Sequence, residues 1–312
     1  MPINLLVIAG PNASGKTRLG VEVAHALRSE IISADSRQTY RGMDIGSGKD
    51  LDEYRKVTPP VPYHLIDVAD PGEVYSVYHL QRDCYRLLEE KAKDPVFAGG
   101  RPLVMVGGTG LFIEAVIRGF RIPNVPENVE LRERLMRRDL EELVEELRES
   151  DPELHERTDR SSKKRVVRAL EIADYARRGP VQTSPPPPVR IDHAVFAVRV
   201  SAEDAEKRID TRLDERLEQG MIEEVRGLLD AGVSPERMAQ IGLEYREVTA
   251  FLTGTKTAEQ MVRDLRREIR RLAKRQRTWF RGLERRGVKV TWIDAGGAET
   301  ILSHPLAASF RS

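Results

Sequence analysis

The chain has 312 residues, enough to bury a full core and to form more than one domain. Hydrophobic residues make up 40% and charged residues 32%, and the formal net charge is only +1. That charge neither favours nor excludes nucleic acid, because 51 basic and 50 acidic side chains can be distributed unevenly. Apolar runs such as Ile3–Ala9 are too short to cross a bilayer, and no secretion signal precedes them. We therefore expect a cytoplasmic protein without a membrane partner.

The one cysteine, Cys84, excludes an intrachain disulfide and a cysteine-based zinc site. It lies in a helical pattern over residues 81–91, which favours a small buried side chain over a nucleophile. Nothing in the sequence demands a second subunit, so we expect a monomer.

Residues 1–120 alternate short β-branched runs with helical patterns, as in a parallel α/β sheet. In chain order, the pattern predicts a strand at Leu5–Ala9, a helix at Lys16–Arg28, strands at Glu30–Ala34 and Tyr63–Val68, a helix at Tyr75–Lys93, and a strand at Pro102–Val106. Ligands of open parallel sheets bind beyond the carboxyl ends of the strands. The polar and glycine residues that follow these strands are therefore candidates for a site.

The pattern becomes purely helical over residues 127–178, which are rich in Glu, Arg, Leu and Asp. The proline tract Ser184–Pro188 then stops any helix. Strand character returns at Val195–Val200, helices follow to about Arg286, and Val288–Ile293 predicts a last strand. We therefore predict a P-loop NTPase-like parallel sheet flanked by helices, built from residues 1–122 and 191–312, with an all-helical insertion at 123–190.

The strongest motif is the glycine-rich loop after the first strand, which matches G-x-x-x-x-G-K-[ST]. Its residues are Gly10, Pro11, Asn12, Ala13, Ser14, Gly15, Lys16 and Thr17. Such a loop directs backbone N–H groups at phosphate oxygens where a helix begins. Lys16 adds a positive charge, and the Thr17 hydroxyl can ligate Mg²⁺. We predict a diphosphate- or nucleotide-binding site here, and the sequence leaves open whether ATP is a ligand.

Two aspartates compete for a role beside that loop. Asp35 follows the second predicted strand, where it could be a metal ligand or a general base. Asp67 ends the run His64-Leu65-Ile66-Asp67, which has the shape of a Walker B strand end. Spacing alone does not decide between them. The turn Gly107–Gly110 follows another strand, and its Thr109 offers a hydroxyl to the same crevice.

Arginines recur every four residues in the helix that opens at Ser201: Arg208, Arg212 and Arg216. Arg212 has an arginine one turn away on either side, so an anionic ligand explains it better than intrahelical pairing. For Arg216 we expect ordinary solvation.

Residues 263–286 hold 11 Lys and Arg against three acidic residues, with Trp279 and Phe280 among them. One face of this helix (Leu265, Ile269, Leu272, Trp279) suits packing on the core. Its exposed arginines would then offer a phosphate-binding surface, and Lys164–Arg168 adds a second basic patch.

Taken together, these motifs resemble the bacterial tRNA dimethylallyltransferases (tRNA isopentenyltransferases) over nearly the whole chain. The matching segments are GPNASGKT, ISADSRQTYRGMDIG, YHLIDV, GGTGLF, KKRVVRALE and LAKRQRTWFR. The resemblance implies dimethylallyl diphosphate as donor. It implies as acceptor the adenine just 3′ of the anticodon, in the anticodon stem-loop of tRNAs that read codons beginning with U. Asn12 and Phe112 stand where the family commonly has Thr and Tyr, and the zinc-finger extension of some eukaryotic relatives is absent.

The resemblance also assigns roles to residues. Asp35 is expected to act as general base, while Thr17, Arg212, Lys16, Thr109 and a Mg²⁺ ion hold the diphosphate. The expected tRNA contacts are Asp35, Ser36, Arg37, Gln38, Thr109, Arg132, Lys164, Arg165, Val166, Val167 and Arg168.

Three other functions remain open from the residues alone. A P-loop small-molecule kinase would use the same loop with Asp35 or Asp67 on Mg²⁺, but it does not need the basic stretch at 263–286. An adenylate isopentenyltransferase would run the same donor chemistry on a free nucleotide and likewise needs no such surface. A non-catalytic RNA-binding P-loop protein leaves Asp35 at the crevice rim without a purpose.

Overall fold

A computed structural model describes residues 2–294 and 296–310, which form two compact units. Unit 1 comprises Met1–Phe120 and Pro187–Ser312, and unit 2 comprises Arg121–Pro186. The sequence predicted that the insertion begins after residue 122 and ends at residue 190. In the structure it begins after residue 120 and ends at residue 186, so the two borders differ by two and four residues. Unit 2 is thus a continuous segment inserted into unit 1.

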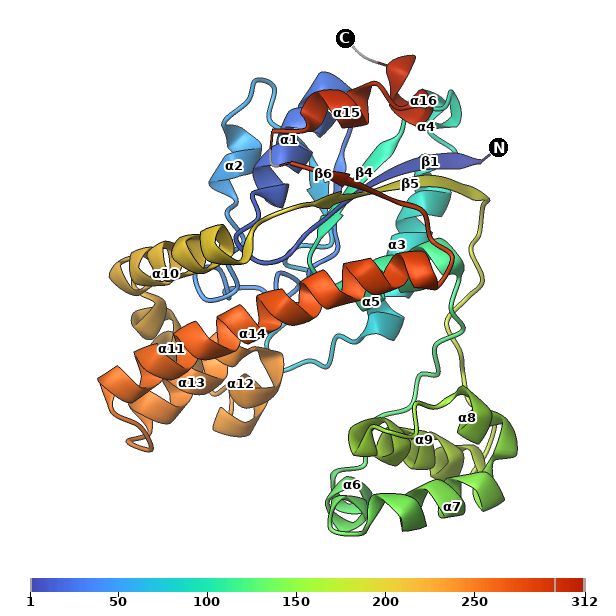
Figure 1. Ribbon diagram of the computed structural model, residues 1–312, viewed down its shortest axis with the longest axis vertical. Coiled ribbons are helices and arrows are strands. Elements are labelled where there is room, and N and C mark those ends of the chain that lie inside the picture. The colour runs from blue at the N-terminus through green and yellow to red at the C-terminus, as the bar shows by residue number, and fades with distance from the viewer. Residues whose placement is uncertain (1, 295, 311–312) are drawn as a thin grey trace. The chain divides into compact units, whose positions relative to one another are not determined.

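Unit 1 is built on one parallel sheet (Figure 1). Its strands among the described residues are β1 (Ile3–Ala9), β2 (Ile31–Ser33), β3 (Tyr63–His64), β4 (Leu103–Gly107), β5 (Ile191–Val198) and β6 (Val290–Ile293). They lie in the order β3-β2-β4-β1-β5-β6. Because β1 is central, the loop that leaves its carboxyl end opens at the middle of the sheet, where ligands of such folds bind.

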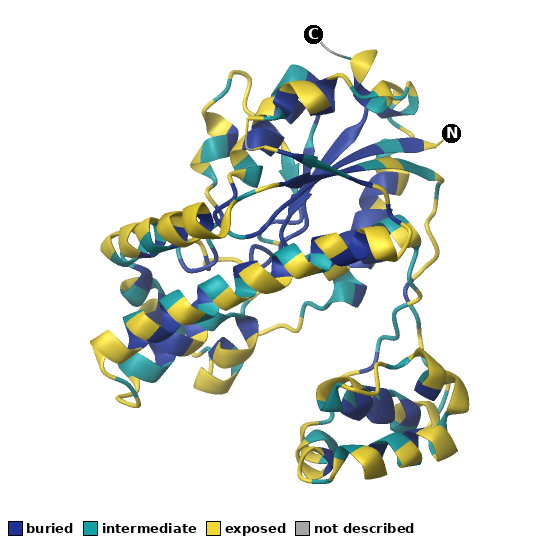
Figure 2. Cartoon of the chain, viewed as in Figure 1, coloured by how far each residue is buried: buried dark blue, intermediate teal, exposed yellow. Residues whose placement is uncertain are grey.

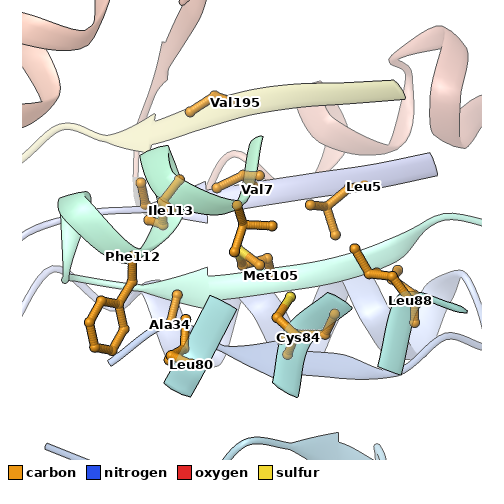
Figure 3. Packing of buried hydrophobic residues seen from close by; sticks show 14 of the residues in the cluster. Leu5, Val7, Ala34, Leu80, Cys84, Leu88, Met105, Phe112, Ile113 and Val195 are labelled. Atoms are coloured by element: carbon orange, nitrogen blue, oxygen red, sulfur yellow. The ribbon is translucent and has the colours of Figure 1, made fainter. Parts of the chain in front are cut away.

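Helices cover both faces of the sheet, and the alternation of β1 decides which residue faces which layer. Leu5 and Val7 point into a core with α3 (Val77–Lys91) and α5 (Gly110–Arg118), to which Cys84 and Ile113 contribute (Figure 3). The alternate residue Leu6 packs with α1 (Lys16–Ala26) and α15 (Ala298–Leu302). Both faces of the central strands are buried, which explains their near-continuous apolar sequence.

The second half of unit 1 adds a helical layer with its own apolar core. It consists of α10 (Ala202–Glu218), α11 (Met221–Asp230), α12 (Pro235–Ile241), α13 (Leu243–Leu252) and α14 (Ala258–Arg285). The long helix α14 buries one stripe and exposes the opposite one, as its alternating colours show in Figure 2. Three short helices complete unit 1: α2 (Asp52–Arg55), α4 (Pro95–Ala98) and α16 (Pro305–Ala308).

Unit 2 is all helical over its described residues. Its helices are α6 (Val129–Met136), α7 (Leu140–Ser150), α8 (Pro152–Arg157) and α9 (Lys163–Ala176). Leu143 and Leu147 from α7 meet Val166 and Leu170 from α9 in a core separate from those of unit 1.

The fold class predicted from the sequence is confirmed: a parallel six-stranded sheet flanked by helices, with an all-helical insertion. The expected strand Tyr63–Val68 is wrong in extent, because β3 ends at His64. Leu65 and Asp67 both adopt positive φ (63° and 55°), a left-handed conformation that no strand accommodates. The apolar pattern of this segment predicted a strand, but its backbone turns at Leu65 and Asp67.

Two further expectations concern Cys84 and membrane-spanning helices. Cys84 is fully buried, and burial raises the pKa of its thiol to about 12, so it packs as a small apolar side chain. Among the described residues, no helix combines the length and apolar character needed to cross a membrane.

Candidate active site

The loop between β1 and α1 forms the floor of a polar crevice at the carboxyl end of the sheet. Gly15 has a φ of 83°, so the backbone turns left-handed immediately before α1 begins at Lys16. The Ser14 hydroxyl is buried and has no hydrogen-bond partner among the described residues. Lys16 Nζ reaches only the Pro11 carbonyl, at 3.5 Å, and burial lowers its pKa to about 8. A buried hydroxyl and an under-used ammonium suit a phosphate group.

Asp35 follows β2 and lines the same crevice as Lys16 and Thr17. Its carboxyl group is nearly buried, and Oδ1 accepts a 3.1 Å hydrogen bond from the Arg37 backbone N–H. Asp67 does not line the crevice, because its carboxylate is bonded to Lys49 Nζ. The structure therefore separates the two aspartates that spacing could not.

The turn Gly107–Gly110 lies directly beside the first loop. Thr109 Oγ1 accepts a hydrogen bond from the Ser36 N–H at 3.2 Å, so it supports the Asp35 segment and does not line the crevice itself. A Cβ on Gly108 would lie 2.5 Å from the Gln276 amide nitrogen and 3.2 Å from the Gly10 carbonyl oxygen. A side chain at Gly108 would crowd both groups, so glycine suits this close approach of the two loops.

Gln276 of α14 ties these loops together. Its Oε1 accepts from the Asn12 N–H at 2.8 Å, while its Nε2 donates to the Gly108 carbonyl at 3.0 Å. Gln276 could not be predicted as a site residue, because a glutamine within a run of arginines carries no local signal in the sequence. The Asn12 side chain adds a contact to the same amide at 3.3 Å.

The wall opposite the loop is formed by α10. Arg212 lines the crevice and forms an ion pair with Asp50, a residue that the sequence analysis did not single out. Arg216 also lines it, so the expectation that Arg216 is merely solvated is wrong. Burial lowers the pKa of Arg216, and Arg212 acts in the same direction. Its guanidinium lies against Gly48, where a Cβ would approach Nη2 to 1.7 Å.

Behind the crevice lies a buried charge cluster centred on Glu244 of α13. Glu244 Oε2 accepts from Arg37 Nη1 at 2.5 Å, and Oε1 lies 3.8 Å from Arg216 Nη1. Burial alone would lower the pKa of Arg37, but Glu244 and Asp35 raise it above its usual range. Arg37 therefore keeps its charge next to the crevice, held by the carboxylate of Glu244, which no sequence motif singles out.

The basic helix α14 is less available for a ligand than its composition indicates. Arg266 pairs with Asp214 at 2.7 Å and Arg270 with Asp210 at 2.5 Å, both on α10. In this half of the helix these arginines already have carboxylate partners but stay about 40% exposed, so the expected phosphate-binding surface stays a prediction here. The basic side chains with no ion pair among the described residues lie further along: Lys274, Arg275, Arg277, Arg281 and Arg285.

The expected tRNA contacts of unit 2 differ in exposure. Lys164 and Arg165 are exposed. Val166 and Val167 are buried in the core of unit 2, so their side chains cannot offer the contact expected of them; they hold α9 in place.

Two arginines of unit 2 share the buried carboxylate of Glu171. Arg132 pairs with Glu171 at 2.6 Å, and Arg168 donates to the Val125 carbonyl at 2.6 Å while lying 3.4 Å from Glu171. The side chains of Arg132 and Arg168 are about one-third exposed, and Arg132 also pairs with Glu127 at 2.7 Å.

The crevice is thus lined by a carboxylate and by a glycine-rich phosphate cradle, together with Lys16, Arg37, Arg212 and Arg216. This fold and this site define the class: the chain is a P-loop α/β protein.

Comparison with known proteins gives the family. The model described as "IPP transferase" matches residues 38–283, and that described as "Isopentenyl transferase" matches residues 3–59. The chain belongs to the IPP transferase family, which confirms the resemblance to the bacterial tRNA isopentenyltransferases.

Relatives and solved structures match this chain over 93% of its length or more. A protein of Syntrophus aciditrophicus named tRNA dimethylallyltransferase 1 is 46% identical over 309 residues, covering 99% of each chain. One of Porphyromonas gingivalis named tRNA dimethylallyltransferase 2 is 46% identical over 291 residues, 93% of this chain and 94% of the other. The tRNA isopentenylpyrophosphate transferase structure from Bacillus halodurans is 32% identical with a TM-score of 0.67, covering 98% of this chain and 96% of that one.

Proposed function

We propose that the chain transfers a dimethylallyl group from dimethylallyl diphosphate to the exocyclic amine of the adenine 3′-adjacent to the anticodon, in tRNAs that read codons beginning with U. Family membership and the names of relatives at 46% identity support this activity. The observation that carries the mechanism is the shared crevice of Asp35 and the P-loop.

Asp35 acts as the general base. The adenine amine is a poor nucleophile because its lone pair is delocalised into the ring. It attacks the allylic carbon C1 while the C1–O bond breaks, and the electron pair leaves with the diphosphate. The amine proton passes to Asp35. The Arg37 N–H fixes Oδ1, while Oδ2 accepts no hydrogen bond from the described residues and is free to receive it. General-base help of this kind contributes about 10²- to 10⁴-fold in rate.

The diphosphate is held where the loop meets α1. Backbone N–H groups at the start of α1, with the side chains of Lys16, Arg212 and Arg216, supply the positive potential that stabilises the leaving group. Lys16 begins α1, so the positive end of the helix dipole adds to this potential. An adenine extruded from its stack would meet Asp35 from the opposite side of the cradle.

Thr17 is the residue that would hold Mg²⁺. Its hydroxyl lines the crevice, and no group of three or more His, Cys, Asp or Glu that could hold a metal is found among the described residues. That donor set fits Mg²⁺, which is commonly held by few protein ligands together with substrate phosphates. When bound, the ion would neutralise charge on the departing diphosphate.

The tRNA contacts proposed for this chain are of two kinds. Ser36, Arg37 and Gln38 accompany Asp35 near the target base, and Gln38 lines the crevice with it. Arg132, Lys164, Arg165 and Arg168 of unit 2 and the unpaired basic residues of α14 would contact the phosphate backbone. Val166 and Val167 are left out because they are buried.

The test is incubation with labelled dimethylallyl diphosphate and either undermodified tRNA or AMP, followed by nucleoside analysis. We expect label on adenosine of tRNA and none on AMP. Label on AMP alone would establish the free-nucleotide transferase. Phosphate transfer from ATP without prenyl transfer would establish the kinase. Labelled tRNA with Lys16→Ala at wild-type yield would remove the P-loop from the reaction.

A further inference from the structure

One carboxylate lies where the proposed donor diphosphate should bind. Asp50 lines the same crevice as Lys16, Thr17 and Arg212, and its Oδ2 is paired with Arg212 Nη2. Both side chains are only about one-third exposed, so water does not fully screen the pair. In the free protein, Arg212 is therefore already neutralised by a residue of the chain itself.

The backbone presents Asp50 to the crevice in an uncommon way. Its φ is 47°, a left-handed conformation that is rare outside glycine and is tolerated best by Asn and Asp. Asn would retain both the conformation and the shape of the side chain while losing its charge. Asp50→Asn is thus a clean substitution at this position.

The segment of the loop that precedes Asp50 is held by contacts to its backbone and by the Lys49 side chain. Glu224 of α11 accepts from the backbone N–H groups of Asp44, Ile45 and Gly46 at 2.7–2.9 Å. Lys49 Nζ, almost fully buried, donates to the Tyr40 carbonyl at 2.7 Å. The segment that immediately precedes Asp50 is thus anchored, which restricts where the Asp50 side chain can lie.

Asp50 and Arg212 also form part of the wall between two cavities. Both residues line the crevice and also a wider outer pocket, together with Gly48 and Arg216. An anion moving between the crevice and this outer pocket would pass the pair.

We propose that Asp50 is a built-in competitor of the diphosphate group: it occupies Arg212 in the free protein, yields it to the bound diphosphate, and re-pairs with it as the product leaves. The inference rests on the proposed function. One guanidinium neutralises two anions less completely than it neutralises a single anion. Asp50 also repels the diphosphate directly. Its presence weakens diphosphate binding and favours release of the product.

The test is calorimetric binding of inorganic pyrophosphate, with Mg²⁺, to the full chain and to Asp50→Asn. We expect the variant to bind pyrophosphate about threefold to tenfold more tightly, the range set by a partly screened pair. Pyrophosphate should inhibit its prenyl transfer correspondingly more strongly. Asp52→Asn is the matched control, because it removes the same charge two residues away at an exposed side chain in the outer pocket.

Several outcomes would overturn the inference. Unchanged or weaker binding by Asp50→Asn would do so, and weaker binding would make Asp50 a ligand of the Mg²⁺–pyrophosphate complex. An equal gain in Asp52→Asn would reduce the effect to overall charge. If wild type binds pyrophosphate but Asp50→Asn does not differ, only this inference is lost. If wild type does not bind pyrophosphate at all, the proposed donor site is lost with it.

Discussion

Glu244→Gln tests whether the buried charge cluster behind the crevice is structural. Gln keeps the size and shape of the side chain and removes only its charge. Glu244 is 1% exposed and faces two guanidiniums, those of Arg37 (11% exposed) and Arg216 (17% exposed). The substitution leaves both cations without their buried counter-ion.

The expected loss follows from that burial. Removing one partner of a buried ion pair costs about 3–5 kcal/mol, because the remaining charge stays desolvated. The short Arg37–Glu244 contact and the second cation place Glu244→Gln within this range, so we expect a loss of about 3 kcal/mol in the free energy of unfolding. Donor use should fall as well, because Arg37 and Arg216 both line the crevice.

Urea unfolding followed by tryptophan fluorescence is the appropriate assay. The chain has two tryptophans, Trp279 and Trp292, and both belong to unit 1, as does Glu244. The signal therefore reports the unit that carries the substitution. The matched control is Glu203→Gln, which breaks an exposed pair with Lys207 at 2.7 Å and should change stability little.

A loss no greater than that of Glu203→Gln would refute this reasoning. It would mean that the two arginines find solvent or another partner without Glu244, and that the cluster does not hold the crevice wall.

Three further predictions concern Lys16, Gln276 and the binding of tRNA. Burial lowers the pKa of Lys16 to about 8, so pyrophosphate affinity should weaken as pH rises from 7 to 9 and the ammonium is lost. Lys16→Arg should flatten this pH profile. A wild-type affinity that does not change between pH 7 and 9 would contradict the prediction. Gln276→Ala leaves the Asn12 N–H and the Gly108 carbonyl without their partner, so the free energy of unfolding should fall by about 1–3 kcal/mol and the KM for the donor should rise. If neither quantity changes, the two glycine-rich loops hold each other without Gln276. The affinity for tRNA should fall with salt at a log–log slope of about −0.7 per phosphate neutralised, measured by filter binding, and a slope of zero would exclude electrostatic contacts.

The phosphate loop could be predicted from sequence because its function is local. Eight consecutive residues between a strand and a helix carry all of its chemistry, and no tertiary contact is needed to recognise it. Asp35 could be predicted as a candidate because it follows a strand at the carboxyl edge of the sheet. Its separation from Asp67 required the structure, since the contact with Lys49 is invisible in the spacing.

The remaining site residues come from distant segments. Asp50 lines the crevice from a loop, while Glu244 and Gln276 support it from two different helices, and all three act through contacts with residues distant in the sequence. Arg216 had a local signal, because it lies one turn from Arg212, but exposure could not be judged without the loop that covers it. The ion pairs of Arg266 and Arg270 in α14 could not be predicted either, since their partners lie on α10.

The most direct test of the central claim is single-turnover prenyl transfer by Asp35→Asn, alongside its affinities for pyrophosphate and for tRNA. We expect the rate to fall by about 10²- to 10⁴-fold with both affinities within about threefold of wild type. A variant that transfers the dimethylallyl group at the wild-type rate would contradict the claim that this carboxylate accepts the proton.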